Sequence, residues 1–206
     1  MPNWVSCELK ITGNDKEINR FIKFAKSKNK LLDMNKFIPY PKKYSILDKL
    51  AKKSEKIRKR ILDYIIKCVR KITEKEYAYL TLDIKNELFN YFPIKKDGYN
   101  SGGYEWCVNN WGTKWNFSNT CIRLRDKNFI HYSFQTPWNI PEPVLLKMSK
   151  LFPELTFNLF ADEEGGFFVL DIEYQNGKIM KKIDLTEEYN MKRKEKYDKL
   201  NQVNTP

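Results

Sequence analysis

The sequence contains no apolar run approaching the ~18 to 20 residues that a membrane-spanning helix needs. Its first ten residues, M-P-N-W-V-S-C-E-L-K, include no basic region followed by an apolar core, so we expect no signal peptide. Both absences argue against a membrane protein and favour an intracellular one. With 206 residues, 41% of them hydrophobic, the chain is long enough for one domain with a sizeable core.

The sequence is poor in residues that bind metals. Its four cysteines, Cys7, Cys68, Cys107 and Cys121, include no C-x-x-C pair, and His131 is the single histidine. This spacing is unsuitable for zinc and for an iron-sulfur cluster, so we expect reduced structural thiols. No G-x-G-x-x-G or Walker pattern is present to cradle a nucleotide. We therefore predict no metal and no cofactor.

Two groups of residues remain as weak candidates for chemistry. His131 lies within a predicted strand, and no serine or cysteine nucleophile motif accompanies it. Asp162, Glu163 and Glu164 could offer clustered oxygens to a divalent cation, but a solvated acidic turn is the preferred interpretation. We predict no catalytic residue and no enzymatic activity.

Positive charge is what the chain has in excess. Lys and Arg outnumber Asp and Glu by 38 to 26, which gives a net charge of +12 and favours an acidic partner. Between Lys42 and Lys71 twelve basic residues accompany three acidic ones, so a net +9 lies in this segment. The residues predicted to bind nucleic acid or another acidic partner are Lys49, Lys52, Lys53, Lys56, Arg58, Lys59, Arg60, Lys67, Arg70 and Lys71. The alternative is a solvated helical face, rich in lysine because the genome is AT-rich.

Hydrophobic periodicity predicts the elements of the first half. Trp4 to Thr12 alternates with period two, which is typical of a half-buried strand. Asn14 and Glu17 form a capping box for a helix that continues to about Ala25. Further along we expect a proline-containing loop at 34–44, helices at about 45–72 and 74–91, and a glycine-rich connector at 95–103.

The second half is mostly extended. The pattern predicts strands at 119–125, 129–136, 155–159, 168–174 and 178–185, a helix at 143–152, and a polar helical tail from about 187. Asn176-Gly177 is a strong signal for a two-residue hairpin turn.

This order of elements predicts an α+β fold. We expect a ferredoxin-like βαββαβ sandwich, an antiparallel sheet with helices on one face, plus extra C-terminal strands. A single domain would cover 1–186, with a basic helical insertion after the first helix at about 42–92 and a polar tail at 187–206.

Several short motifs resemble one family. They are P-N-W at 2–4, N-N-W-G-T-K-W at 109–115, F-Q-T-P-W at 134–138, F-P-E-L-T-F at 152–157 and E-E-G-G-F-F at 163–168. In this order they resemble the YubB ferredoxin-like family, small proteins carried by phages, plasmids and bacterial genomes. The resemblance implies a ferredoxin-like fold without an iron-sulfur cluster, no established reaction, and the cytoplasm of a bacterial host cell. The tract Asn139-Ile140-Pro141 departs from the family's Ser-Pro-Pro.

The tryptophan-rich stretch, Tyr104 to Asn116, has two interpretations. Its side chains could stack on a nucleic-acid base, or they could fill the space between the helices and the sheet. We favour the structural interpretation for the motif residues Trp4, Asn109, Asn110, Trp111, Gly112, Thr113, Lys114, Trp115, Trp138 and Gly165.

Three functional hypotheses follow. The first is a non-enzymatic mobile-element protein that binds nucleic acid or a nucleoprotein through the basic insertion. The second is an inhibitor of a host defence system that acts by contact with an acidic protein surface. The third is an enzyme with a site near Trp111, Lys114 and Glu164.

Overall fold

The computed structural model describes residues 3–70 and 97–203. The helix predicted at 74–91 and the binding residue Lys71 lie outside the described residues. The chain divides into two compact units, Met1–Pro39 with Glu105–Pro206, and Tyr40–Tyr104. Each unit is described by itself below. The proposed domain boundaries at 1–186 and 187–206 remain a prediction.

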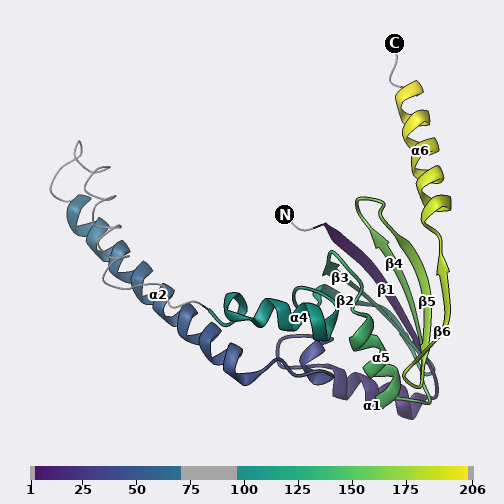
Figure 1. Ribbon diagram of the computed structural model, residues 1–206, viewed down its shortest axis with the longest axis horizontal. Coiled ribbons are helices and arrows are strands. Elements are labelled where there is room, and N and C mark those ends of the chain that lie inside the picture. Colours follow the sequence, from purple (N-terminus) through teal and green to yellow (C-terminus); the bar gives the residue numbers. More distant parts are fainter. Residues whose placement is uncertain (1–2, 71–96, 204–206) are drawn as a thin grey trace. The chain divides into compact units, whose positions relative to one another are not determined.

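The first unit is built on a six-stranded antiparallel sheet (Figure 1). In chain order the strands are β1 (Trp4–Thr12), β2 (Ser118–Asp126), β3 (Phe129–Pro137), β4 (Thr156–Glu163), β5 (Val169–Gln175) and β6 (Lys178–Asp184). Their spatial order is β2-β3-β1-β4-β5-β6, with every neighbouring pair antiparallel. Together with the helices between the strands, the first four strands make the predicted ferredoxin-like βαββαβ arrangement, and β5 and β6 extend it. The α+β ferredoxin-like fold is thus confirmed.

Helices α1 (Asp15–Ala25) and α5 (Glu142–Leu151) lie on one face of this sheet (Figure 1). The core beneath them centres on Phe21 of α1, which is fully buried. Its ring lies 5.1 Å from that of Phe152 and 5.5 Å from that of Phe157, measured between centroids. The rings of Phe37 and Tyr132 lie at 6.0 and 6.4 Å. The edge-to-face contacts with Tyr132 and Phe157 join the helix to β3 and β4, while the Phe37 ring stacks on Phe21.

The ends of the elements follow the predicted local chemistry. The Asn14 side chain accepts a hydrogen bond from the Glu17 amide at 2.9 Å, which caps α1. The turn between β5 and β6 has positive φ at both central residues, +48° at Asn176 and +74° at Gly177. A type I′ turn requires this geometry, so the predicted hairpin is confirmed.

The opposite face of the sheet is polar. On β1, Ser6, Lys10 and Thr12 are exposed there, whereas the alternate residues of the strand are buried. Helix α6 (Thr186–Val203) contacts this face, because its Tyr189 ring lies 5.5 Å from that of Phe160. Phe160 stands opposite Glu8 in the sheet register, on the polar side. The C-terminal helix thus begins with a contact to this face of the sheet.

The second unit contains the long helix α2 (Lys42–Arg70) and a 3-10 turn, η2 (Tyr99–Ser101). The Asp48 carboxylate accepts a hydrogen bond from the Tyr99 amide at 2.9 Å, which ties the turn to the helix. The backbone carbonyl of Tyr44 lies 2.0 Å from the position that a Cβ would take at residue 98, so glycine is required at Gly98.

Two shorter elements were not predicted. A 3-10 turn, η1 (Met34–Lys36), lies within the stretch expected as a loop. The tryptophan-rich stretch begins as a helix, α4 (Gly103–Trp111), where the sequence pattern predicted no element. Among the described residues, none of the helices is long and apolar enough to cross a membrane.

Candidate nucleic-acid interface

Most of the basic residues of α2 gather on one side of the helix. At about 100° per residue, Lys49, Lys53, Lys56, Arg60 and Lys67 fall within an arc of about 60°. We call these five residues the basic ridge. All five are exposed, and the ridge runs for about 27 Å at 1.5 Å per residue. The long helix therefore presents a straight row of cations.

The opposite side of α2 is the more covered one. Its residues, all of them half-buried, are Leu47, Ala51, Ser54, Arg58 and Ile61. None of the described side chains of α2 is fully buried. The basic ridge thus points away from the side on which the helix packs.

The structure also places the other residues predicted to bind an acidic partner. Lys52 and Lys59 are exposed beside the basic ridge, and Arg58 belongs to the half-buried side. Arg70 is the last residue of α2. The segment 42–70 contains eleven basic and three acidic residues, a net charge of +8.

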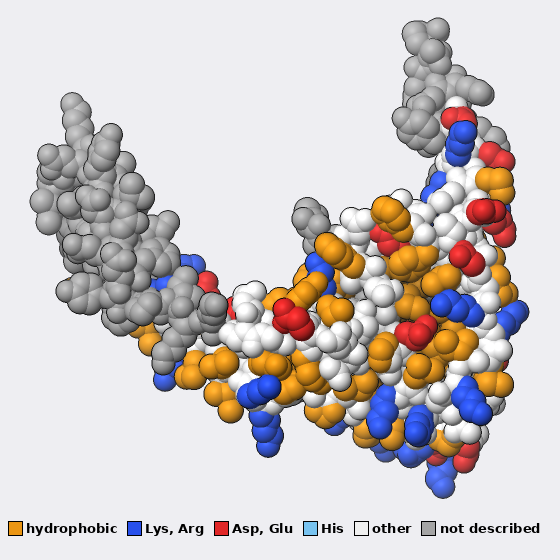
Figure 2. All heavy atoms as spheres, in the orientation of Figure 1, with side chains coloured by type: hydrophobic (Ala, Val, Ile, Leu, Met, Phe, Trp, Pro, Cys, Tyr) orange, Lys and Arg blue, Asp and Glu red, His pale blue; other side chains and the backbone are white. Residues whose placement is uncertain are grey.

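An apolar edge follows one flank of the basic ridge. It consists of Ile46, Leu50, Ile57 and Tyr64, whose exposed fractions are 55%, 45%, 43% and 70%. Their directions fall within an arc of about 40° that begins beside Lys53. Figure 2 shows hydrophobic and basic side chains together on the visible part of α2. The surface of this helix therefore offers cations and apolar contacts side by side.

Residues of the tryptophan-rich stretch make contacts within the protein. Trp111 is buried, and its indole Nε1 donates a hydrogen bond to the Ile38 carbonyl at 2.8 Å. The Asn110 side chain donates to the Trp106 carbonyl at 2.9 Å, whereas Asn109 is exposed. These contacts favour the structural interpretation of this part of the motif.

The turn after α4 is equally constrained. Gly112 has a φ of +78°, and a Cβ there would lie 2.8 Å from the Pro143 ring and 3.0 Å from the Ile140 carbonyl oxygen. Thr113 is buried and donates its hydroxyl to the Trp115 carbonyl at 2.8 Å. Glycine is therefore required where this turn meets the start of α5.

The other motif tryptophans make separate contacts. Trp4 packs edge-to-face on Trp115 with centroids 6.0 Å apart, while Trp106 packs on Trp111. Trp138 is 56% exposed in a left-handed backbone conformation, with a φ of +69°. The Lys114 ammonium lies 3.2 Å from the centroid of its ring, a cation-π contact that holds the exposed indole.

The three carboxylates considered for a cation are engaged separately. Asp162 pairs with Arg193, and Glu164 accepts from the Trp4 amide at 2.9 Å. Glu163 is buried and accepts from the Phe167 amide at 3.1 Å, with Gly165 close against its carboxylate. Within residues 3–70 and 97–203 no group of three or more His, Cys, Asp or Glu side chains could hold a metal ion.

Sequence reasoning missed a polar network on the open face of the sheet. Arg123 Nε donates to the Ser133 hydroxyl at 3.0 Å, and the Cys121 sulfur lies 3.2 Å from the same oxygen. Nearby, His131 Nε2 lies 2.5 Å from Glu8 Oε2. The first set of contacts joins β2 to β3 and the second joins β3 to β1, and β2 takes part across two irregularities of register. Because these irregularities displace the strand from simple alternation, no sequence pattern would have brought the residues together.

The buried thiols are placed for structure. Burial raises the pKa of the Cys7 thiol to about 12, so this cysteine stays protonated and unreactive. Cys107 is buried as well, and Cys121 is half-buried; all three are free thiols, as predicted.

Comparison with known proteins bears on the C-terminal half. The model of the family described as the ferredoxin-like domain in Api92-like protein matches residues 110–204. This half is similar to that domain. The crystal structure of a protein api92 from Yersinia pseudotuberculosis is 11% identical, with a TM-score of 0.49, covering 89% of this chain and 98% of that one. The search of curated proteins finds no match.

The resemblance to the YubB family is therefore wrong, since the matching family model is that of Api92-like proteins. The motifs that carried it are turn and core residues, such as Gly112 and Trp111, whose identity is set by packing. Short packing motifs can recur in different families of one fold. The mobile-element setting inferred from that resemblance loses its basis.

Proposed function

We propose that the protein is a non-enzymatic binding protein that engages nucleic acid through the basic ridge of α2. The observation that carries this proposal is the alignment of Lys49, Lys53, Lys56, Arg60 and Lys67 on the exposed side of one helix. None of these five residues forms an ion pair within the described part of the chain. Their charge is free to neutralise phosphates and release counterions.

The composition of α2 supports binding without sequence preference. The helix contains no asparagine or glutamine, the residues that read adenine in the major groove. Lysine predominates over arginine along it, and lysine contacts phosphate as a point charge without the bidentate geometry of a guanidinium. Phosphate contacts position a protein on nucleic acid but carry no sequence information directly.

Fluorescence anisotropy with labelled DNA of random sequence, across a range of salt concentrations, tests the proposal. In the full chain, Lys49, Lys53, Lys56 and Arg60 are replaced together by Glu. We expect the affinity at low salt to fall by about a hundredfold or more, because four phosphate contacts become repulsions.

A matched control keeps the same change of net charge. Lys127, Lys147, Lys178 and Lys181 are exposed residues of the first unit, and their replacement by Glu changes the charge equally. We expect this control to weaken binding by less than about tenfold. Equal losses in the two variants, or no binding by the unaltered protein at low salt, would contradict the proposal.

A second candidate function has support from the apolar edge. Exposed Ile46, Leu50 and Ile57 beside the cations fit an acidic protein surface with apolar contacts better than a phosphate backbone. Replacing Ile46, Leu50 and Ile57 by Ser separates the two functions. Unchanged DNA affinity supports the nucleic-acid function. Loss of a partner protein that co-purifies after nuclease treatment, with DNA affinity retained, supports the second.

A further inference from the structure

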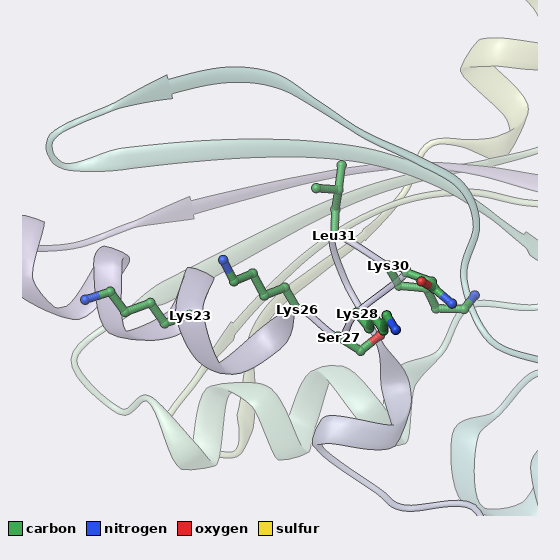
Figure 3. A pocket seen from close by; sticks show the side chains of 7 residues that line it. Lys23, Lys26, Ser27, Lys28, Lys30 and Leu31 are labelled. Carbon is green, nitrogen blue, oxygen red and sulfur yellow. The ribbon is translucent and has the colours of Figure 1, made fainter.

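The first unit carries a basic hollow of its own, outside α2. Its volume is about 680 Å³, and it is lined by the end of α1 and the loop that follows (Figure 3). We call it the lysine hollow; its lining residues are Lys23, Lys26, Ser27, Lys28, Asn29, Lys30 and Leu31. Four of the seven are lysines and none is acidic, so the lining has a charge of +4.

The backbone of the loop is held in place. The Ser27 amide donates to the Lys30 carbonyl at 2.9 Å, and the Asp33 amide donates to the Ala25 carbonyl at 2.9 Å. The Lys30 ammonium donates to the Phe117 carbonyl at 3.0 Å. These three bonds fix the turn, so the loop offers its lysines from a preformed frame and a ligand need not order it.

The acidic side chain that follows this loop is turned inward. Asp33 is buried, and its carboxylate accepts from the Asn116 side chain at 2.7 Å and from the Asn35 amide at 3.0 Å. Burial alone would raise the pKa of this carboxyl, but hydrogen bonds from Asn116, Ser27 and Asn35 outweigh it and lower the pKa. The carboxylate organises the loop, and among the described residues it forms no ion pair with the lysines.

The helix dipole accounts for part of this charge. Lysines in the last turn of a helix stabilise it, which explains Lys23 and the C-cap residue Lys26. The effect falls off within the last turn, and α1 ends at Ala25. Lys28 and Lys30 lie beyond its reach. The bond to the Phe117 carbonyl accounts for Lys30, whereas the helix gives no reason for the charge of Lys28.

The four lysines come from two segments. In Figure 3 Lys23 and Lys26 project from α1, whereas Lys28 and Lys30 belong to the loop that follows, on the side of Ser27. A ligand that contacts lysines of both segments must be extended and carry anionic charge along its length.

We propose that the lysine hollow binds an oligophosphate, a chain of linked phosphates such as a free polyphosphate or a nucleoside triphosphate carries. Such a chain offers anionic oxygens to the lysines of both segments, and charge-assisted bonds from ammonium groups to phosphate are strong. The flexible lysine stems can follow its shape. This site lies in the first unit, whereas the basic ridge of α2 lies in the second.

Isothermal titration of the full chain at low salt with tripolyphosphate, pyrophosphate and orthophosphate tests the proposal. We expect the affinity to fall in that order as the number of phosphates decreases. Replacing Lys26 and Lys28, one from the end of α1 and one from the loop, by Glu is expected to weaken tripolyphosphate binding by about tenfold or more. Both side chains are exposed, and a thermal melt of the variant verifies that it folds.

Two controls separate this site from others. Lys178→Glu with Lys181→Glu on β6 makes the same change of charge and is expected to leave the affinity within about twofold. The α2 variant with four Glu is expected to retain tripolyphosphate binding, even if it loses DNA. Three outcomes would each overturn the proposal. They are equal weakening in the Lys26/Lys28 and Lys178/Lys181 variants, loss of tripolyphosphate binding in the α2 variant, and no binding of tripolyphosphate by the unaltered protein.

A nucleoside triphosphate distinguishes the two sources of the ligand. If it binds as tightly as tripolyphosphate, the phosphate chain is the group recognised, as proposed. If it binds while tripolyphosphate does not, the nucleoside is recognised instead and the proposal fails.

Discussion

Helices α1 and α2 belong to different units and differ in what determines their sequences. Helix α1 has 11 residues and buries Ile18, Phe21 and Ala25 against the sheet. Helix α2 has 29 residues, yet none of its described side chains is fully buried. Packing therefore fixes the composition of α1, whereas it leaves most positions of α2 open to charge.

This difference separates two kinds of information in one chain. Where side chains are close-packed, a residue is chosen for shape, and its loss is measured in folding free energy. Where they are exposed, the cost of substitution for stability is small, and a consistent pattern such as the basic ridge points to a partner. Substitutions matched between the two units measure how complete this separation is.

The largest expected effect is the loss of the central aromatic ring of the core. Phe21→Ala should lower the free energy of unfolding by about 3–5 kcal/mol, because it leaves a cavity among four aromatic rings. Ile57→Ala on α2, where the side chain is 43% exposed, should cost less than about 1 kcal/mol. Urea denaturation of both variants measures the difference. Similar costs would show that α2 also has a tightly packed core.

A buried carboxylate gives the next largest effect. Asp33→Ala removes the acceptor of hydrogen bonds from Asn35 and Asn116 and should cost about 1.5–3 kcal/mol, since these bonds go to a buried charged group. Asp48 of α2 is half-buried, and Asp48→Ala removes one hydrogen bond from the Tyr99 amide, which should cost about 0.5–1.5 kcal/mol. Chemical denaturation at neutral pH compares them.

The same carboxylate predicts a dependence on pH. The pKa of Asp33 is lower in the folded protein than its ordinary value of 3.8, so the ionised form stabilises the fold. This contribution is complete above the ordinary pKa and is lost as the pH falls through the folded pKa. The stability advantage over Asp33→Asn should therefore shrink below pH 3.8. A constant advantage down to the acid limit would contradict the lowered pKa.

How much of this could be predicted is clearest at particular residues. Alternation of apolar and polar residues predicted the bounds of β1 as they are observed. Asn14 predicted a helix cap and Asn176-Gly177 a hairpin turn, each by local chemistry. These features depend on neighbours in the sequence. The ferredoxin-like order followed from them.

Features that depend on residues distant in the sequence could not be predicted from it. The network of Arg123, Ser133 and Cys121 requires the register of β2 with its irregularities. The lysine hollow requires the bond from Lys30 to Phe117, 87 positions away in the chain. The basic ridge was identified as a charged segment, but its straightness depended on α2 being one continuous helix.

The cap of α1 gives a smaller effect. Asn14→Ala removes the acceptor for the Glu17 amide and should cost about 1 kcal/mol. Asn109→Ala is the control, because Asn109 is exposed in α4, and it should change stability by less than about 0.5 kcal/mol. Thermal and urea denaturation resolve the two. An equal loss in both variants would argue against a specific capping bond.

The smallest change tests α2, where a substitution is expected to affect binding but not stability. Lys56→Gln removes one charge from the centre of the basic ridge and should leave the unfolding transition unchanged within about 0.5 kcal/mol. DNA binding should weaken a fewfold, and the slope of log affinity against log salt should decrease in magnitude by about 1, because one phosphate contact is lost. Lys147→Gln, on the exposed side of α5, removes the same charge from the first unit. If it changes the salt slope as much as Lys56→Gln does, DNA senses the net charge of the whole protein and the ridge has no special role. If the salt slope changes only in Lys56→Gln, DNA contacts the basic ridge itself. Binding to a partner then accounts for a charge pattern that packing does not require.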